Sequence, residues 1–475
     1  MAQGKTNRWA QVAACLLCTL LMLCASVPPA WAADLPAFAD DERVVVIDDQ
    51  TGAVICSQGA DERAYPASTT KLVTALVALD YVSDRLDERV TVGDELDLTP
   101  EISSLAHLEK DDSYTWRELF YGLLLPSGND AAIVMGVNVA RIETGNASLS
   151  GEEGIAEFAR LMNEKVAALG CTGSHFVNPH GLHDDAHYTT ANEMLLIAQE
   201  VLKSDFVREI VSTPYYGCTS GNGVQMDWYN TNWMLQQTCG QVDDYGSVWH
   251  EGEGDVPNPY YRAQCTGVKT GSTAEAGRCL VFMAAGDGMS LLGVVLHAAD
   301  GPTLYTQTDQ ILDSVLTQYE RHVWSDGKTD VATVGLANPD LPDRLAQTTS
   351  LAVRTDDTYL TTVDMTQDIR TEVVWDENYT AGAADGERRL TATVVEGTQV
   401  ATLDCYVAGE LVGSYPLVAT SSHTPWGTMD YVALVTIGLV LLLVVVLAIA
   451  GIARAVSNRR RKRRQTDYRQ SAHRR

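Results

Sequence analysis

The sequence is poor in basic residues and lacks several common signatures of binding proteins. It has 34 Lys and Arg against 62 Asp and Glu, with no tandem repeat and no extended low-complexity tract. After residue 32 it contains no Cys-x-x-Cys pair of the kind that binds zinc. An acidic surface also repels the phosphates of nucleic acid. We therefore expect no nucleic-acid partner, no metal and no cofactor.

The first 32 residues have the three parts of a secretory signal. Lys5 and Arg8 supply positive charge, residues 12–24 are apolar, and Ala30-Trp31-Ala32 resembles a cleavage site. We expect a signal peptide, residues 1–32, that is cleaved after Ala32. The residues that follow it are then exported.

An apolar run of 23 residues without charge, 431–453, is long enough to span a bilayer as a transmembrane helix. Arg454 and the basic block 459–464 follow it, and positive charge beside a span stays in the cytoplasm. We expect a single-pass cell-membrane protein with residues 33–430 outside and a basic cytoplasmic tail, 454–475. The basic block alone could suggest nucleic acid, but beside a span the anionic inner leaflet is the simpler partner.

The exported part, residues 33–430, is strongly acidic. It has 22 basic and 61 acidic residues, a net charge of −39. It also holds seven cysteines, an odd number, so at least one thiol is unpaired within a monomer. The pairing of the others stays open, and none has a histidine context that would favour a cysteine nucleophile.

Three short motifs occur in one order. They are Ser68-Thr69-Thr70-Lys71, Ser127-Gly128-Asn129 and Lys269-Thr270-Gly271. Together they supply a nucleophile, a lysine base, a second hydroxyl and a cation that could bind a carboxylate. This is the equipment of a serine acyl-transfer enzyme.

The context of Ser68 separates it from a second match to its motif. Ser68 precedes an apolar helical run, residues 72–79, so it should lie at a helix N-terminus with Lys71 one turn later on the same face. Free N–H groups there favour an anionic serine oxygen. Ser325 and Lys328 have the same spacing, but they lie in a polar turn.

The other two motifs also have informative surroundings. Ser127 and Asn129 separate two apolar helical stretches, 119–125 and 131–139, where buried polar groups are unfavourable unless they face a site. The rival Ser220-Gly221-Asn222 lies in a polar loop. Lys269 ends a predicted strand, 264–269, that turns back through 273–277 into a second strand, 278–285. We expect this edge to form the wall of a cleft.

Longer stretches around these motifs resemble one enzyme family. They are residues 65–76, 161–163, 176–182, 188–191, 267–273 and 276–277. Over about residues 35 to 325 the chain resembles the low-molecular-mass penicillin-binding proteins, the serine-type D-alanyl-D-alanine carboxypeptidases of peptidase family S11. The resemblance implies peptidoglycan stem pentapeptides as substrate and β-lactam antibiotics as covalent inhibitors.

The predicted architecture is an α/β fold of the α+β type. The strand hairpin at 43–56, the helical middle and a closing helix at 304–323 are similar to the penicillin-recognising serine transferase and β-lactamase-like domain, an antiparallel sheet with an inserted helical region. We assign residues 33–325 to it. Residues 326–425, with short strands at 350–354, 371–375, 390–395 and 399–407, suggest a small β-sandwich stalk. Residues 215–258 have no readable fold.

The chemistry of acylation can be assigned to three residues. Ser68 needs a base within reach, and Lys71 is the residue that the helical spacing supplies. A lysine ordinarily has a pKa near 10.4, but burial and the charge of Lys269 should lower the pKa of Lys71. Ser127 can relay a proton to the departing amine.

The remaining motif residues are assigned to substrate binding. Asn129 would hold the substrate amide, and Lys269 with Thr270 would bind the free carboxylate of a terminal D-alanine. By analogy with the family, the backbone N–H groups of Ser68 and Ser272 would stabilise the oxyanion. A DD-endopeptidase, a β-lactamase and a non-enzymatic wall-binding protein remain alternatives on the same fold.

One cluster could suggest a metal site. His180, His183 and His187 lie close in sequence with two aspartates, but Pro179 and Gly181 favour a loop over the helix that would align the imidazoles. We expect the segment to buttress the catalytic cleft.

Overall fold

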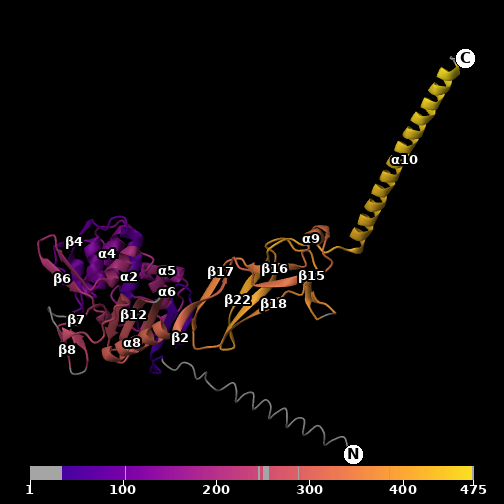
Figure 1. Cartoon of the computed structure of the whole chain (residues 1–475). Coiled ribbons are helices and arrows are strands. Elements are labelled where there is room, and N and C mark those ends of the chain that lie inside the picture. The colour runs from indigo at the N-terminus through magenta and orange to yellow at the C-terminus, as the bar shows by residue number, and fades with distance from the viewer. Residues whose placement is uncertain are drawn as a thin grey trace, which may run out of the picture. The chain divides into compact units, whose positions relative to one another are not determined.

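The computed structural model describes residues 35–101, 103–243, 246–249, 256–286, 288–384 and 386–472. These residues form two compact units, which Figure 1 shows along the chain. The N-terminal unit extends to His322 and includes Thr361–Gln367, and the C-terminal unit holds Val323–Leu360 and the chain from Asp368 onward. The predicted signal peptide lies outside the described residues.

A five-stranded antiparallel sheet is the framework of the N-terminal unit. Its strands, in spatial order, are β11 (Cys265–Thr273), β12 (Gly277–Gly286), β13 (Met289–Ala298), β1 (Arg43–Asp48) and β2 (Val54–Gln58). Successive side chains of a strand point to opposite faces. Val44 and Val46 therefore belong to one hydrophobic cluster and Val45 and Ile47 to another, so both faces of the sheet are covered.

A helical region, inserted between β2 and β11, covers one face of the sheet. Its elements are η1 (Ala67–Thr70), α2 (Lys71–Val82), β3 (Arg89–Thr91), η2 (Asp94–Leu98), β4 (Ser113–Thr115), α3 (Trp116–Leu124), α4 (Asn129–Thr144), α5 (Gly151–Ala168), α6 (Ala191–Val201) and α7 (Asp205–Ser212). The first eight residues of α2 are all buried, because neighbouring helices surround it. Capping boxes start α3 and α5. The predicted inserted helical region is confirmed.

Helix α8 (Gly301–Gln318) covers the other face of the sheet, packing against β12 and β13. The predicted closing helix, 304–323, is wrong at its end. Residues Tyr319–Asp326 form strand β14, which pairs with β17 (Thr358–Asp364). This pairing joins residues far apart in sequence, so local periodicity could not reveal it.

The segment without a predicted fold consists of short elements. They are β5 (Tyr215–Thr219), β6 (Gln225–Tyr229), η3 (Trp233–Leu235), β7 (Thr238–Cys239), β8 (Gln241–Val242), β9 (Val248–Trp249) and β10 (Val256–Pro257). The β5–β6 hairpin is attached to the helical region by stacked rings, with Tyr216 between Tyr121 and Trp228. The indole N–H of Trp228 donates to the carbonyl of Ala106 at 2.8 Å.

The C-terminal unit is rich in β structure, as predicted. Its seven-stranded sheet has the order β18 (Ile369–Trp375), β21 (Gln399–Val407), β22 (Glu410–Ala419), β16 (Ser350–Thr355), β15 (Ala332–Leu336), β20 (Arg388–Leu390) and β19 (Thr380–Gly382). The strand expected at 390–395 is wrong: β20 ends at Leu390, and of the following residues Val394 makes an isolated bridge to His423.

Two helices complete this unit. Helix α9 (Leu341–Ala346) is short, and α10 (Thr428–Ala472) is the long yellow helix of Figure 1. Residues Thr428–Arg464 are long and apolar enough to cross a membrane, and within the described residues no other helix meets that test. The side chains of the apolar part are exposed. By length and composition, α10 is a candidate membrane anchor.

Candidate active site

Ser68 and Lys71 lie together where η1 runs into α2. The Lys71 amine Nζ is 2.9 Å from the Ser68 hydroxyl Oγ. Ser68 is half-buried and Lys71 is buried. The predicted helix start is confirmed, although its first turn is a 3-10 turn rather than an α-helical one. Lys71 is therefore placed to exchange a proton with Ser68.

The Lys71 amine has two further partners besides Ser68. It donates to the side-chain oxygen Oδ1 of Asn129 at 2.7 Å and to the backbone carbonyl of His180 at 2.8 Å. Burial, followed by the charge of Lys269, holds the pKa of Lys71 well below its usual value, while Asp130 opposes the shift. Lys71 thus has the properties of a general base.

Lys269 lies within strand β11, the edge strand of the five-stranded sheet. Burial lowers its pKa to about 7, and its Nζ donates to the carbonyl of Thr270 at 3.1 Å. Its predicted place at the end of a strand is wrong. Strand β11 continues to Thr273, because pairing with β12 extends from Lys269 opposite Val281 to Thr273 opposite Gly277.

Strand β11 lies directly against the turn that carries the nucleophile. A Cβ atom on Gly271 would be 2.9 Å from the carbonyl oxygen of Pro66 and 3.1 Å from the backbone nitrogen of Ser68. Glycine is the residue that allows this approach. Thr270 is half-buried and Ser272 is exposed on either side of Gly271. The first and third motifs therefore meet, as the sequence predicts.

The second motif is the loop between α3 and α4. Ser127 has a φ of +61°, which is unusual for a residue with a side chain, and its hydroxyl is buried. Among the described residues this hydroxyl has no hydrogen-bond partner. Asn129 begins α4 and contacts Lys71. A buried hydroxyl without a partner is available to form a hydrogen bond with a substrate or to relay a proton.

The carboxylate of Asp130 fixes the neighbouring chain. It accepts hydrogen bonds from the N–H groups of Ala106 at 2.8 Å, Leu108 at 3.0 Å and Ala131 at 2.9 Å. No sequence motif pointed to Asp130. Its position directly after the Ser127 motif was the one available signal.

Thr231 is a second residue that the sequence analysis missed. Its hydroxyl is 2.5 Å from the hydroxyl of Thr270, and its N–H donates to the carbonyl of Leu125 at 3.1 Å. It therefore connects strand β11 with the chain before Ser127. It belongs to the segment without a readable fold, so no local pattern marked it.

The histidine-containing segment is a loop that supports the site. Nδ1 of His187 accepts from the N–H of Val177 at 3.1 Å, so its Nε2 carries the proton and donates to the Thr70 hydroxyl at 2.8 Å. Burial lowers the pKa of His187 to about 4 and that of His180 to about 3. The described residues contain no group of three His, Cys, Asp or Glu that could bind a metal. The expected buttressing loop is confirmed.

The second matches to the motifs have ordinary structural roles. Ser325 lies in β14, and its hydroxyl is 2.6 Å from that of Thr355. The hydroxyl of Ser220 accepts from the N–H of Val224 at 3.1 Å inside the hairpin turn. The seven described cysteines all carry free thiols.

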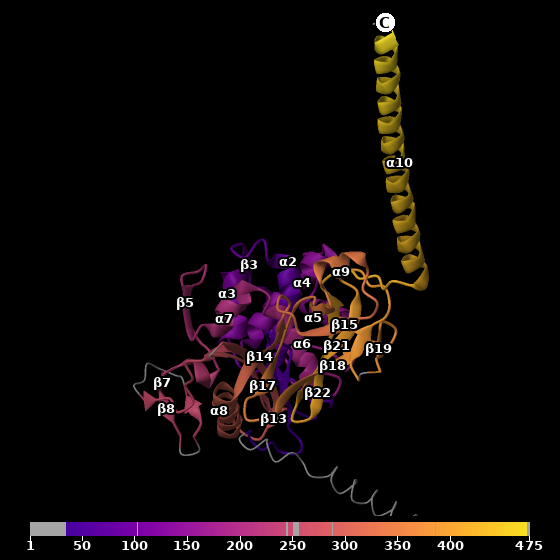
Figure 2. The ribbon, with the colours of Figure 1, turned by 45° about the vertical axis from the view of Figure 1, so that its right-hand side comes forward.

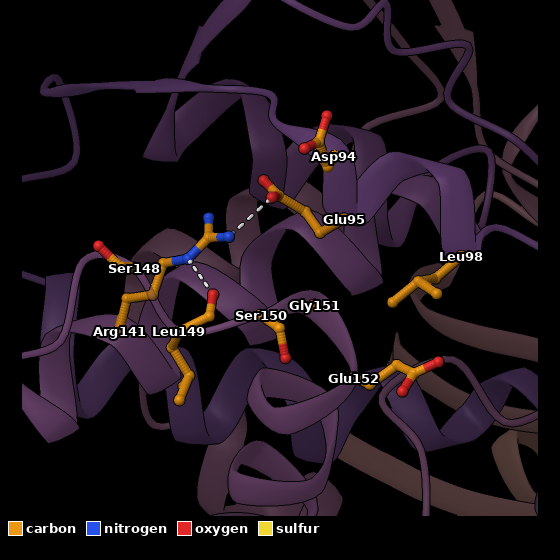
Figure 3. A pocket seen from close by; sticks show the side chains of 9 residues that line it. All are labelled: Asp94, Glu95, Leu98, Arg141, Ser148, Leu149, Ser150, Gly151 and Glu152. Atoms are coloured by element: carbon orange, nitrogen blue, oxygen red, sulfur yellow. Dashed lines mark hydrogen bonds and ion pairs between the residues drawn. The ribbon is translucent and has the colours of Figure 1, made fainter.

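A pocket of about 320 Å³ lies elsewhere in the helical region (Figure 3). It is lined by Asp94, Glu95, Leu98, Arg141, Ser148, Leu149, Ser150, Gly151 and Glu152. Arg141 pairs with the buried Glu95 at 3.0 Å and donates to the carbonyl of Leu149 at 3.2 Å. None of the three motifs lines this pocket, and the Arg141–Glu95 pair joins η2 to α4.

Comparison with known proteins places the site in a family. Residues 32–246 match the model of peptidase S11, the D-alanyl-D-alanine carboxypeptidases. A D-alanyl-D-alanine carboxypeptidase of Streptomyces sp. K15 is 31% identical over 270 residues, which are 55% of this chain and 82% of that protein. D-alanyl-D-alanine carboxypeptidase DacF of Bacillus subtilis is 29% identical over 59% of this chain and 63% of its own length. The chain thus spans less than two thirds of that relative.

Solved structures agree on the fold. A variant of the Streptomyces K15 DD-transpeptidase matches with a TM-score of 0.50 and 28% identity, covering 58% of this chain and 98% of that one. The D-alanyl-D-alanine carboxypeptidase DacD of Francisella tularensis matches with a TM-score of 0.62 and 21% identity over 83% of this chain and 95% of that one. The fold and the paired serine and lysine define a penicillin-recognising serine enzyme. The chain belongs to the peptidase S11 family.

Proposed function

We propose that this protein is a serine-type D-Ala-D-Ala carboxypeptidase that removes the terminal D-alanine from peptidoglycan stem pentapeptides. The observation that carries the proposal is the 2.9 Å contact between Lys71 Nζ and Ser68 Oγ in a buried site. The relatives bear the same activity in their names. Family membership and geometry thus support one reaction.

Acylation begins with proton transfer. Neutral Lys71 accepts the hydroxyl proton of Ser68 as Oγ attacks the carbonyl carbon between the two D-alanines. The C–N bond of the tetrahedral intermediate then breaks, and the amine of the terminal D-alanine leaves with a proton relayed through Ser127. The buried, unpartnered hydroxyl of Ser127 supports this role. The peptide remains as an ester on Ser68.

Residues of strand β11 and the start of α4 bind the substrate. Charged Lys269, with the hydroxyl of Thr270, binds the free carboxylate of the terminal D-alanine, and Asn129 holds the substrate amide. The N–H groups of Ser68 and Ser272 stabilise the oxyanion. Thr231 orients Thr270 through the 2.5 Å contact between their hydroxyls.

Release completes the cycle. Water attacks the ester carbonyl, the C–Oγ bond breaks and the shortened peptide departs while Ser68 regains its proton. A β-lactam ring presents an acylating carbonyl beside a carboxylate, so β-lactams acylate Ser68 and act as covalent inhibitors. The active site needs no metal or other cofactor for these steps.

We assign the chain's parts to an exported, membrane-anchored enzyme. Residues 1–32 are a signal peptide, 33–325 the catalytic domain, 326–425 a stalk, 431–453 a transmembrane helix and 454–475 a cytoplasmic tail. The apolar, exposed side chains of α10 and the basic block after them support this topology. The catalytic domain then faces the cell wall.

Product analysis tests the reaction. The full-length protein is incubated with a defined pentapeptide and, separately, with a cross-linked peptide dimer. The masses of the products are measured by mass spectrometry. We expect loss of one alanine and a tetrapeptide product, abolished in Ser68→Ala and retained in Ser325→Ala. Cleavage of cross-linked dimers without tetrapeptide formation would indicate an endopeptidase. Transfer to an added amine would indicate the transpeptidase reaction named for the K15 structure.

A further inference from the structure

Helix α9 exposes an apolar face at one end of the C-terminal unit. None of its six residues is buried. Leu341 and Leu345 are one turn apart and therefore share a face, and their exposed fractions are 38% and 77%. Met429, in the first turn of α10, is 76% exposed. Three large apolar side chains are thus open to solvent near the start of the proposed membrane span.

Contacts fix α9 to the base of α10. The Arg344 guanidinium donates to the Tyr431 hydroxyl and lies over the Tyr431 ring, 5.3 Å from its centroid. The backbone N–H of Trp426 donates to the backbone carbonyl of Asn338 at 2.8 Å. The Trp426 ring packs edge-on against the Tyr431 ring, with 5.2 Å between the ring centroids. Figures 1 and 2 both show α9 beside the base of α10. Helix α9 is therefore at the level where the apolar run begins.

A contact between Asp343 and the buried His423 holds the opposite side of α9. The Asp343 carboxylate is 2.7 Å from Nδ1 of His423, and the His423 side chain is 1% exposed. His423 also bridges to Val394 through its backbone. The polar side of α9 is thus used for attachment to the unit, while Leu341 and Leu345 are exposed and are not among the buried hydrophobic residues of the unit.

We propose that Leu341, Leu345 and Met429, here called the α9 foot, insert into the outer leaflet between headgroups and acyl chains. The inference rests on the membrane anchoring proposed above. Tyr431 is the first residue of the apolar run and contacts Arg344, so the bilayer in which α10 lies is the surface that the foot meets. Trp and Tyr favour this interfacial level, and an arginine can extend its charge to the phosphates.

The physical consequence is a second point of attachment. The contacts of α9 with α10 lie at one point of the unit, so a unit above a single spanning helix can still tilt about that point. Burial of the foot's apolar surface opposes that tilt, because removing apolar surface from water is favourable. The C-terminal unit thereby rests on the membrane.

Depth-dependent quenching tests the proposal. Full-length Leu345→Cys, carrying an environment-sensitive fluorophore, is reconstituted at one copy per lipid nanodisc with lipids that bear a nitroxide near the top of the acyl chain. Leu411→Cys is the matched control, because Leu411 is 55% exposed on β22. Unsubstituted protein gives the background from native thiols. We expect quenching several-fold stronger at residue 345 than at residue 411.

Equal quenching at the two positions would overturn the proposal. The proposal would also be overturned if the fluorophore at residue 345 were quenched or shielded only in nanodiscs that hold two copies of the protein. That result would indicate a contact between copies. Protease protection of the apolar span is measured on the same samples. An inserted span with an unquenched residue 345 refutes the foot alone, whereas an accessible span refutes the anchoring as well.

A second pair of variants gives an independent readout. Leu341→Glu with Leu345→Glu alters exposed positions, so the fold is retained, and trypsin cleavage after Arg344 reports access to α9. With each rate in nanodiscs divided by the rate of the same chain in detergent micelles, we expect the native chain to be cleaved several-fold more slowly than the double variant. Equal rates would contradict insertion.

Discussion

Lys269, on the edge strand β11, lowers the pKa of Lys71, at the start of α2. Both amines are buried, and burial lowers the pKa of Lys269 itself to about 7. In the proposed mechanism one cation therefore has two functions: it adds to the effect of burial in keeping Lys71 neutral, and it attracts the substrate carboxylate. The pH dependence of the enzyme should reflect both.

Lys269→Ala should lower kcat/KM on a pentapeptide by about 10- to 150-fold, the loss of a charge-assisted contact of about 1.5–3 kcal/mol. Without the charge, Lys71 holds its proton to higher pH, so the acidic limb of the pH profile of kcat/KM should move upward. The alkaline limb, set by Lys269 near pH 7 in the native enzyme, should disappear.

Steady-state kinetics across pH check this expectation, with Lys203→Ala on the exposed surface as control. A pentapeptide with an amidated C-terminus should be a poor substrate of the native enzyme and lose little more on substitution. Equal cleavage of free and amidated peptides would argue against carboxylate recognition and for an endopeptidase.

Gly271→Ala should abolish acylation through a local displacement of strand β11 from the Ser68 turn, with the rest of the fold retained. The new Cβ would be 2.9 Å from the Pro66 carbonyl, which is backbone and cannot rotate away. The strand and the Ser68 turn would have to separate. Gly286→Ala on β12, where the nearest atoms are at 3.4 Å or more, is the control. The rate of acylation by a β-lactam is measured for both variants. An unchanged rate in Gly271→Ala would show that acylation does not need strand β11 to lie so close to the Ser68 turn.

Asp130→Ala should destabilise the protein by several kcal/mol. It leaves the buried N–H groups of Ala106 and Leu108 without an acceptor, at about 1–3 kcal/mol each. Denaturant unfolding gives the free energy, and Asp184→Ala in the exposed loop serves as comparison. A loss below 1 kcal/mol would mean that the chain relaxes around the site.

His187 should make the protein less stable in acid. The folded state binds a proton at His187 more weakly than the unfolded chain, whose ordinary pKa is 6.5. Above pH 6.5, His187 is neutral in both states and costs no stability. As the pH falls from 6.5 towards 4, the free energy of unfolding decreases by at most about 3 kcal/mol, because the unfolded chain binds the proton more tightly. Stability curves from pH 7 to 4 should be shallower for His187→Gln than for the native protein. Parallel curves for His187→Gln and the native protein would exclude His187 as the cause.

The sequence predicted those parts of the site that depend on local pattern. The apolar run after Ser68 indicated the helix that carries Lys71, and two apolar stretches indicated the loop of Ser127. It failed where long-range pairing decides. The pairing of β11 with β12 places Lys269 within a strand, and the pairing of β14 with β17 ends α8 at Gln318.

Some contacts have no sequence signal at all. The group of His180 that accepts a hydrogen bond from Lys71 is the backbone carbonyl, which every residue possesses. Thr231 reaches Thr270 through a segment of short strands whose course is set by tertiary packing. Such residues become visible only when the loops are placed around the helix.

Ser68 is the nucleophile in the proposed reaction. The most direct measurement is mass-spectrometric mapping of the adduct formed when the full-length protein reacts with a fluorescent penicillin. We expect one adduct, on the peptide that contains Ser68, and none on Ser68→Ala. Label on Ser325, or undiminished labelling of Ser68→Ala, would show that a residue other than Ser68 is acylated.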